Sequence, residues 1–500
     1  MAAESTTLDG SARVLPAWLR SRGFIGPVLA IGVVQLVAAM DGPIVVFALP
    51  RIQSELGLSD ATRAWVVSAY MLTFGGLILL GGRLGDTIGR KRTFIIGVGL
   101  FTAASALCSV AWNGEVLVAA RLLHGVAAAI VAPTCTALLA TAFPKGPARN
   151  AATAVFGAMA SIGAVLGLVL GGILTEVSWR LVFVLNVPIG VLVICLAYTM
   201  LDETQRERMR LDAAGAVLAT LTFTAAVFGF SMGPEAGWRS APTLVLGIVA
   251  LIGFIAFVVV ELRADNPIVP FSLFVDRDRV ATFIAMFLVS GVAFTLTVLI
   301  ALYLQNIMGY PPLRAGLAFI PIAIAMAVGT VLSSRLVTRM SPRALVVTGA
   351  AMVLGGTLCG GLNLSSDGPY FPNLLLPIII GAIGIGLINV PLGLSLIGSV
   401  GADRIGPASA IVVMLQSLGG PLVLVVVQVV MTLHTRGSGA AAGSVDADNV
   451  ALLDQGYTYG VLWLAAVAAL LAGVAMFIRY TARDVAFAQQ SLKDAESGVV

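Results

Sequence analysis

Long apolar segments recur along nearly the whole chain, and they constrain its fold more than any other feature. Each is roughly 20 residues long, enough for a helix rising 1.5 Å per residue to cross the ~30 Å hydrocarbon core of a bilayer. A mean hydropathy of +1.01 with 11% charged residues excludes an ordinary soluble protein, because only lipid can solvate so much apolar surface. The sequence therefore predicts an all-α polytopic membrane protein.

Charged, Pro or Gly clusters separate these apolar segments into fourteen predicted transmembrane helices. The pattern leaves no soluble domain of any size between them. The spans lie near residues 24–49, 64–82, 93–112, 116–141, 151–174, 180–200, 213–232, 241–262, 280–305, 313–333, 344–363, 374–398, 406–433 and 457–478.

The order of spans and polar stretches predicts two six-helix bundles with two helices inserted between them. A weak internal repeat supports this division, because the basic loop at 83–92 has a counterpart at 335–343. Repeated halves that meet around a midplane site are a common transporter design. The predicted parts are a cytoplasmic N-terminal arm (1–23), an N-terminal bundle (24–200), cytoplasmic linkers with the two inserted helices (201–279), a C-terminal bundle (280–479) and a cytoplasmic tail (480–500).

The basic residues predict the orientation in the membrane. Most of the 29 Lys and Arg residues fall in the N-terminal arm, the even-numbered loops and the C-terminal tail, which places both termini in the cytoplasm of a plasma (inner) membrane protein. A net charge of +4 does not indicate a nucleic-acid partner, because these residues are scattered over short loops. No signal-peptide pattern precedes the first span, so we expect that span to stay in the mature protein.

Neither a metal site nor a nucleotide site is predicted. The four cysteines lie inside apolar spans, at spacings that fit neither a CxxC motif nor zinc coordination. The chain also lacks a P-loop GxxxxGK[ST]. We therefore expect no cofactor and no enzymatic activity, and the energy for any transport has to come from a gradient or a partner. The oligomeric state is left open by the sequence.

Asp41 and Arg121 are the charged residues that lie deep inside predicted spans, away from the span ends, and an ionisable group in hydrocarbon costs several kcal/mol unless it is paired, hydrated or protonated. Their depths along the first and fourth spans differ by only ~5 Å at 1.5 Å per residue, which allows them to pair. His124 follows Arg121 by three residues on the same helical face. Either the pair only locks two helices together, or Asp41 exchanges Arg121 for a proton during transport. His124 either shares the proton path or is a packing residue.

The loop after the second span resembles motif A of the major facilitator superfamily, GxLaDrxGrkxxl. Physically, its glycines allow tight turns between helices, and its acid caps a helix or pairs with a basic residue, so the loop can latch one conformation. Ordinary positive-inside anchoring explains the basic residues but not an acid between two glycines. The matching positions are Gly82, Asp86, Gly89, Arg90 and Lys91.

Two further segments resemble motifs of this superfamily in the expected order. The segment around Arg121 and Gly125 resembles motif B, with His124 at the usual Gln position. The fifth span resembles the antiporter motif C, with Leu168 in place of its usual Pro, and its four-residue glycine spacing makes a flat face for close helix packing. The glycines of that face are Gly163, Gly167, Gly171 and Gly172.

The chain is most similar in its signatures to the fourteen-helix drug:proton antiporter family. Asp41 followed by Ala48-Leu49-Pro50 resembles the first-helix signature, and segments at 179–190 and 303–321 resemble two later ones. The segments 143–150 and 416–421 look like a mycobacterial efflux member of that family. The resemblance implies the major facilitator fold and proton-coupled efflux, by antiport and alternating access, of drugs or other lipophilic compounds.

By this resemblance, a substrate cavity lies between the two bundles. With one carboxylate and few polar groups, it would suit apolar or cationic amphiphiles, lipids included, with protons and membrane lipids as the other partners. Two alternatives stay open: a lipid exporter or flippase, and a membrane-embedded ligand sensor or scaffold that moves nothing. The candidate cavity residues are Gln35, Trp65, Tyr70, Phe319, Met326, Asn389 and Gln416.

Overall fold

The computed structural model is helical almost throughout the residues that it describes. Within them no strand is present, so the all-α prediction is confirmed. The described residues are 22–143, 147–203, 213–263, 271–337, 339–365, 368–400, 405–436 and 447–479.

Each of the fourteen predicted spans coincides with one helix or with a broken pair of helices. The helices before the inserted pair are α1 (Arg22–Leu56), α2 (Asp60–Ile88), α3 (Arg90–Ser109), α4 (Gly114–Ala142), α5 (Pro147–Val177), α6 (Arg180–Val184) and α7 (Asn186–Met200). The inserted pair is α8 (Ala213–Ala236) and α9 (Ala241–Arg263). The later helices are α10 (Arg277–Asn306), α11 (Pro312–Ala318), α12 (Ile320–Leu336), α13 (Pro342–Asn363), α14 (Leu375–Ser399), α15 (Ile405–Arg436) and α16 (Ala447–Ala475), with short turns at Phe271–Phe274 and Tyr370–Leu374.

Length and apolar composition qualify twelve segments of the described chain as membrane spans. Two predicted spans, those of α2 and α8, are not among the twelve, and in α8 only the shorter stretch Val217–Gly229 is apolar enough. A multi-pass membrane protein is therefore supported, whereas the count of fourteen crossings stays a prediction.

Short polar side chains begin several helices. Ser59 accepts a hydrogen bond from the backbone N–H of Thr62 at 3.2 Å, and Asn113 accepts one from Val116 at 2.8 Å. Asp276 does the same at the start of α10. These caps satisfy backbone donors that have no partner inside the helix.

Two predicted spans are each interrupted at one residue, where the helical hydrogen-bond pattern lapses although that residue keeps right-handed helical φ/ψ. The span at 180–200 breaks at Leu185, between α6 and α7. The span at 313–333 breaks at Phe319, just before Pro321, which has no N–H to donate and cannot continue the preceding helix. The break at Leu185 places Asn186 at the first position of α7.

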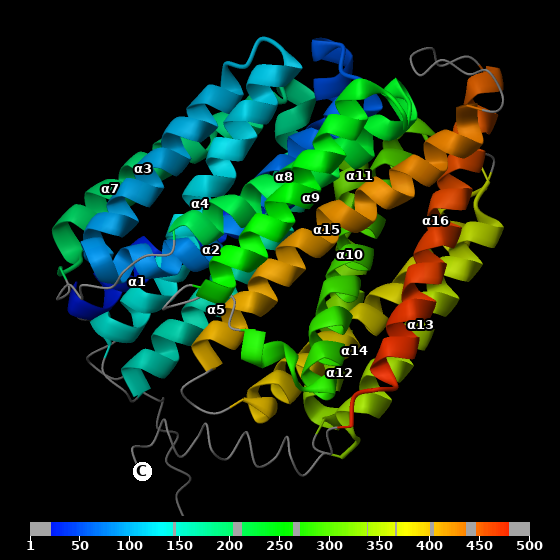
Figure 1. The fold of residues 1–500 in the computed structure, drawn as a ribbon. Coiled ribbons are helices and arrows are strands. Elements are labelled where there is room, and N and C mark those ends of the chain that lie inside the picture. The colour runs from blue at the N-terminus through cyan, green and yellow to red at the C-terminus, as the bar shows by residue number, and fades with distance from the viewer. Residues whose placement is uncertain are drawn as a thin grey trace, which may run out of the picture.

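The helices form two groups with the inserted pair at one seam between them. In Figure 1, α1–α7 (blue to teal) lie on one side and α10–α16 (green to red) on the other. The helices α2 and α15 pack against each other, and α8 packs on both. The ring of Phe228 on α8 meets that of Trp65 on α2 edge-on, at 5.0 Å between centroids. The pair α8–α9 therefore covers the α2/α15 seam.

The two groups also meet where α1 and α5 end, through α11. A Cβ added to Gly172 would lie 2.7 Å from the Cα of Leu313, and one added to Gly316 would lie 2.6 Å from the carbonyl oxygen of Leu168. Glycine at these positions lets α5 and α11 touch backbone to backbone. This end of the bundle is closed between the halves.

The predicted division into bundles, linkers and arms stays a prediction. Almost all of the predicted arm at 1–23, the whole tail at 480–500, and the linker stretches 204–212 and 264–270 lie outside the described residues.

Candidate functional site: a buried ion pair beside a cavity

Close packing of α5 on α1 positions the turn that carries the buried acid. A Cβ on Gly167 would lie 2.6 Å from the carbonyl oxygen of Met40, and one on Gly171 would lie 2.9 Å from that of Ile44. Gly163 makes the same kind of contact one turn earlier. Because these glycines have no side chain, α5 holds the α1 backbone directly, as the flat glycine face predicts.

Asp41 and Arg121 are fully buried and form a direct ion pair. Nη1 of Arg121 lies 2.7 Å from Oδ2 of Asp41. Nε of the same guanidinium donates to the carbonyl oxygen of Val66 at 2.9 Å, and its Cζ lies 4.6 Å from the centre of the Tyr70 ring. A backbone oxygen and an aromatic face thus hold Arg121 in addition to its counter-ion, which offsets part of the cost of burying two charges.

His124 extends this ion pair into a hydrogen-bonded network. Nη1 of Arg121 lies 3.0 Å from Nδ1 of His124, and Nε2 of His124 lies 3.1 Å from Oγ of Ser105. Because the guanidinium has only donors, Nδ1 accepts, and the ring hydrogen belongs on Nε2. The imidazole is therefore neutral in this arrangement, and its ring packs 4.0 Å from that of Phe101.

Asn186 belongs to the same network, and sequence reasoning missed it. Its Nδ2 lies 3.4 Å from Oδ1 of Asp41 and 3.3 Å from Oγ of Ser105. The only signal in the sequence was that Asn186 falls in the segment 179–190, which resembles a family signature. That resemblance assigned no role to the residue. Ser105 carried no signal, because a serine inside an apolar span is ordinary.

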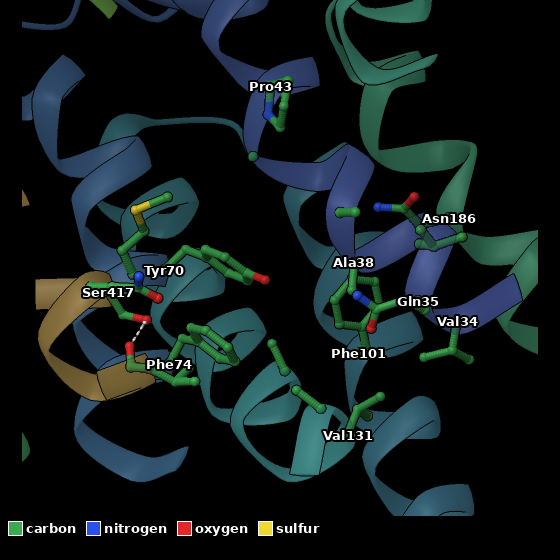
Figure 2. A pocket seen from close by; sticks show the side chains of 18 of the residues that line it. Val34, Gln35, Ala38, Pro43, Tyr70, Phe74, Phe101, Val131, Asn186 and Ser417 are labelled. Atoms are coloured by element: carbon green, nitrogen blue, oxygen red, sulfur yellow. Dashed lines mark hydrogen bonds between the residues drawn. The ribbon is translucent and has the colours of Figure 1, made fainter. Parts of the chain in front are cut away.

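A cavity of about 570 Å³ lies between the two helix groups. It is lined from α1, α2, α3, α4 and α7 on one side and from α10, α12 and α15 on the other, and this volume is typical of a small-molecule site. Figure 2 shows Gln35, Ala38 and Asn186 on one side of it and Tyr70, Phe74 and Ser417 on the other. No charged side chain is among the described residues that line this cavity.

Two lining residues connect the cavity to the ion pair. Asp41 and Arg121 do not line the cavity themselves, whereas Asn186 and Tyr70 line it and also touch the pair. Asn186 and Tyr70 therefore form the wall between the buried charges and the cavity.

Four of the seven predicted cavity residues line this cavity, and the other three do not. The lining members are Gln35, Tyr70, Met326 and Gln416. Trp65 is buried against α8, and Phe319 is buried against Phe47, with ring centres 5.2 Å apart, at the closed end. Asn389 is exposed on α14, where its Nδ2 donates to the carbonyl oxygen of Ile385. Helix rotation turns these three away from the cavity, which a one-dimensional pattern does not report.

The loop resembling motif A packs against the end of α7. Gly89 has a φ of +105°, which favours glycine, and a Cβ there would lie 2.6 Å from Oε1 of Glu203. Glu203 accepts from the backbone N–H of Lys91 at 3.2 Å and lies 3.5 Å from Nε of Arg92. Glu203 is therefore the acid that contacts the start of α3. Motif A predicted this role for Asp86, whose side chain lies outside the described residues.

The other motif A positions lie at helix junctions. Arg90 donates to the carbonyl oxygen of Ala137 on α4 at 3.3 Å. Gly82 faces Pro133 of the same helix, and Lys91 donates from Nζ to the carbonyl oxygen of Tyr198 on α7 at 2.9 Å. The loop thus ties α3, α4 and α7 together at one end of the first helix group.

The described residues contain no cluster of three or more His, Cys, Asp or Glu side chains that would hold a metal ion. Cys108 and Cys135 are buried, Cys195 and Cys359 are exposed, and all four are free thiols.

Comparisons with known proteins give a consistent family. The Major Facilitator Superfamily model matches residues 31–424. The chain is 57% identical to the uncharacterized MFS-type transporter EfpA of Mycobacterium tuberculosis, over 99% of this chain and 94% of that protein. It is 35% identical to the puromycin resistance protein pur8 of Streptomyces alboniger over 88% of each chain, and 36% identical to the cephamycin export protein CmcT of Amycolatopsis lactamdurans over 81% and 84%.

Solved structures agree on the fold. A bacterial homolog of the human lysosomal transporter Spinster, in an inward-facing and unoccupied conformation, matches with a TM-score of 0.65 and 14% identity, over 92% of this chain and 97% of that one. At this identity the match shows the arrangement of the helices alone.

Proposed function

Because this chain belongs to the major facilitator superfamily of membrane transporters, we propose that it is a proton-coupled exporter of lipophilic or amphiphilic compounds in the plasma membrane. The observation that carries the proposal is the fully buried pair of Asp41 and Arg121 directly behind the wall of a cavity shared by both helix groups. The puromycin resistance and cephamycin export relatives support export of small molecules.

Alternating access is supported by where the two halves touch. They are closed through α11 at the end where α1 and α5 finish, and the cavity lies on the other side of that contact. With both termini in the cytoplasm, as the basic residues predict, the closed end faces outward and the cavity is reached from inside. The structure then corresponds to the inward-facing state of the cycle.

In the proposed cycle, a proton and Arg121 compete for Asp41. A proton bound to Asp41 removes the charge that attracts the guanidinium. Arg121 then keeps its neutral partners, which are the Val66 oxygen, Nδ1 of His124 and the Tyr70 ring. Protonation from outside therefore loosens α1 from α4 and favours release of substrate outward. Loss of the proton to the cytoplasm restores the pair and resets the carrier.

Purified protein in liposomes with an imposed pH gradient tests this proposal. The unaltered protein is expected to move a lipophilic dye against its gradient only while the pH gradient lasts. Asp41→Asn keeps an oxygen that accepts from Arg121 but removes the charge, so it is expected to bind the dye and lose gradient-driven transport. Full coupled transport by Asp41→Asn would overturn the mechanism.

Lipid export is a second candidate, favoured by the mostly apolar lining of the cavity. The same liposomes with a fluorescent phospholipid in one leaflet distinguish the two. Movement of the phospholipid in preference to the dye identifies a lipid exporter, and binding of either ligand without movement identifies a sensor or scaffold.

A further inference from the structure

Three of the hydroxyl groups that line the cavity are already used within the protein. The hydroxyl of Ser290 donates across to α15, and those of Thr297 and Ser417 donate to carbonyl oxygens of their own helices. A hydroxyl whose hydrogen is committed to a backbone carbonyl offers a ligand only acceptor capacity. These residues therefore contribute little selectivity for a polar head.

Two side-chain amides in the cavity keep their full hydrogen-bonding capacity. Gln35 on α1 and Gln416 on α15 both line the cavity and are half-buried, and neither amide has a hydrogen-bond partner within the described chain. Each amide carries two N–H donors and one acceptor oxygen. They come from different halves of the protein, so one ligand head that contacts both of them connects the halves.

The described lining of the cavity offers no counter-charge to an ion. Among the described residues that line it none is charged, and the Asp41 carboxylate is neutralised by Arg121 and lies behind Asn186 and Tyr70. Moving an ionised group from water into such a site is costly, because nothing compensates the lost hydration. A neutral head that both donates and accepts hydrogen bonds avoids this cost.

We propose that the cavity selects neutral amphiphiles, with the polar head held between the Gln35 and Gln416 amides and the apolar tail against the surrounding aliphatic and aromatic wall. This inference rests on the proposed export function and narrows its substrates, because it removes cationic amphiphiles from the preferred class.

Three probes with the same twelve-carbon tail test the selectivity: dodecanamide, dodecylammonium and dodecanoate. Each competes with the neutral dye N-phenyl-1-naphthylamine for protein in lipid nanodiscs, and empty nanodiscs correct for partition into lipid. Dodecanamide is expected to bind at least about tenfold more tightly than either ion, a difference that about 1.4 kcal/mol produces.

Single substitutions assign the effect to the two amides. Gln35→Leu and Gln416→Leu are each expected to weaken dodecanamide binding about five- to tenfold, and to leave the dye unchanged, because each removes hydrogen bonds without adding charge. Gln305→Leu is the matched control, since Gln305 donates to Ala301 of its own helix and does not line the cavity. Gln35→Glu is expected to reverse the preference towards dodecylammonium, a gain that misfolding does not produce.

The outcomes separate this inference from the proposal on which it rests. Tighter binding of dodecylammonium by the unaltered protein, or unchanged dodecanamide binding in both leucine variants, overturns the neutral-head assignment and leaves export intact. Absence of binding for every probe and the dye overturns the export of lipophilic compounds and this inference together. Loss of pH-driven transport alone, with the binding preference kept, overturns only proton coupling.

Discussion

The two halves of the molecule are built alike but carry different chemistry. In α1–α7 the buried polar groups include a carboxylate, a guanidinium and an imidazole in one network, whereas in the described part of α10–α16 the buried polar residues are neutral Ser and Thr side chains. Both halves pack their helices through glycines. A Cβ on Gly349 of α13 would lie 2.7 Å from the carbonyl oxygen of Gly384 on α14, as close as the contacts between α5 and α1.

This difference indicates that close packing through glycines is common to both halves, whereas the network of buried charges is found in the first half. Small residues at helix crossings set the shape of each bundle, so similar contacts serve both halves. A buried charge is costly and needs partners from several helices, so one such network is enough for a carrier that couples to a single site. We infer that the first half senses the proton, and that the second half supplies the opposite wall of the cavity and the closing contact.

Arg121→Leu is expected to have the largest effect, and it tests whether the buried charges distinguish the first half from the second. It leaves the Asp41 carboxylate buried without its cation, a loss that typically costs 3–5 kcal/mol, so about that decrease in unfolding free energy is expected. Thermal unfolding in lipid nanodiscs measures it. Arg314→Leu in the second half, where the guanidinium stacks on Tyr310 at 4.0 Å, is the control and is expected to change stability far less. Equal losses in the two variants would contradict the asymmetry.

Gly167→Val and Gly349→Val compare the packing that the halves share. Both place side-chain atoms against a neighbouring backbone, and each is expected to cost about 1–3 kcal/mol of stability through overpacking. Only Gly167→Val displaces the turn that carries Asp41, so it alone is expected to abolish pH-driven transport at a temperature where both proteins remain folded. Gly473→Ala, at a position with nothing within 4 Å, is the neutral control.

His124→Leu and His124→Gln refine the role of the imidazole. Leucine removes one hydrogen-bond partner from Arg121 and one from Ser105, so it is expected to lower stability by about 1–3 kcal/mol and to slow coupled transport. Glutamine has an acceptor and a donor for the same two residues and stands at this position in motif B, so it is expected to retain both properties. If His124→Gln keeps stability but loses coupling, the imidazole itself takes part in proton movement.

Asn389→Leu is expected to have the smallest effect and sharpens the assignment of Asn186. Asn389 is exposed and donates only within its own helix, so its loss is expected to change stability by less than about 0.5 kcal/mol and to leave transport unchanged. Asn186→Leu removes the amide beside Asp41 and is expected to alter the pH dependence of transport. Matching transport profiles for the two variants would remove Asn186 from the coupling network.

Several features of the fold were predictable because they depend on local sequence alone. A segment of apolar residues long enough to cross a bilayer has to form a helix, since lipid offers no partner for free backbone groups. The helix positions and the all-α class therefore followed from the sequence. So did the pairing of Asp41 with Arg121, because charges inside spans are rare and these two lie at similar depth.

The sequence by itself determined where the helices lie and which charges had to find partners. The tertiary structure decided which side chains surround those charges. Asn186 reaches Asp41 because α7 packs against α1, and Trp65 and Phe319 turn away from the cavity because of how α2 and α11 are rotated. The physical reason is that helix formation is a local requirement of the bilayer, whereas helix rotation, tilt and breaks are set by packing between segments far apart in the chain.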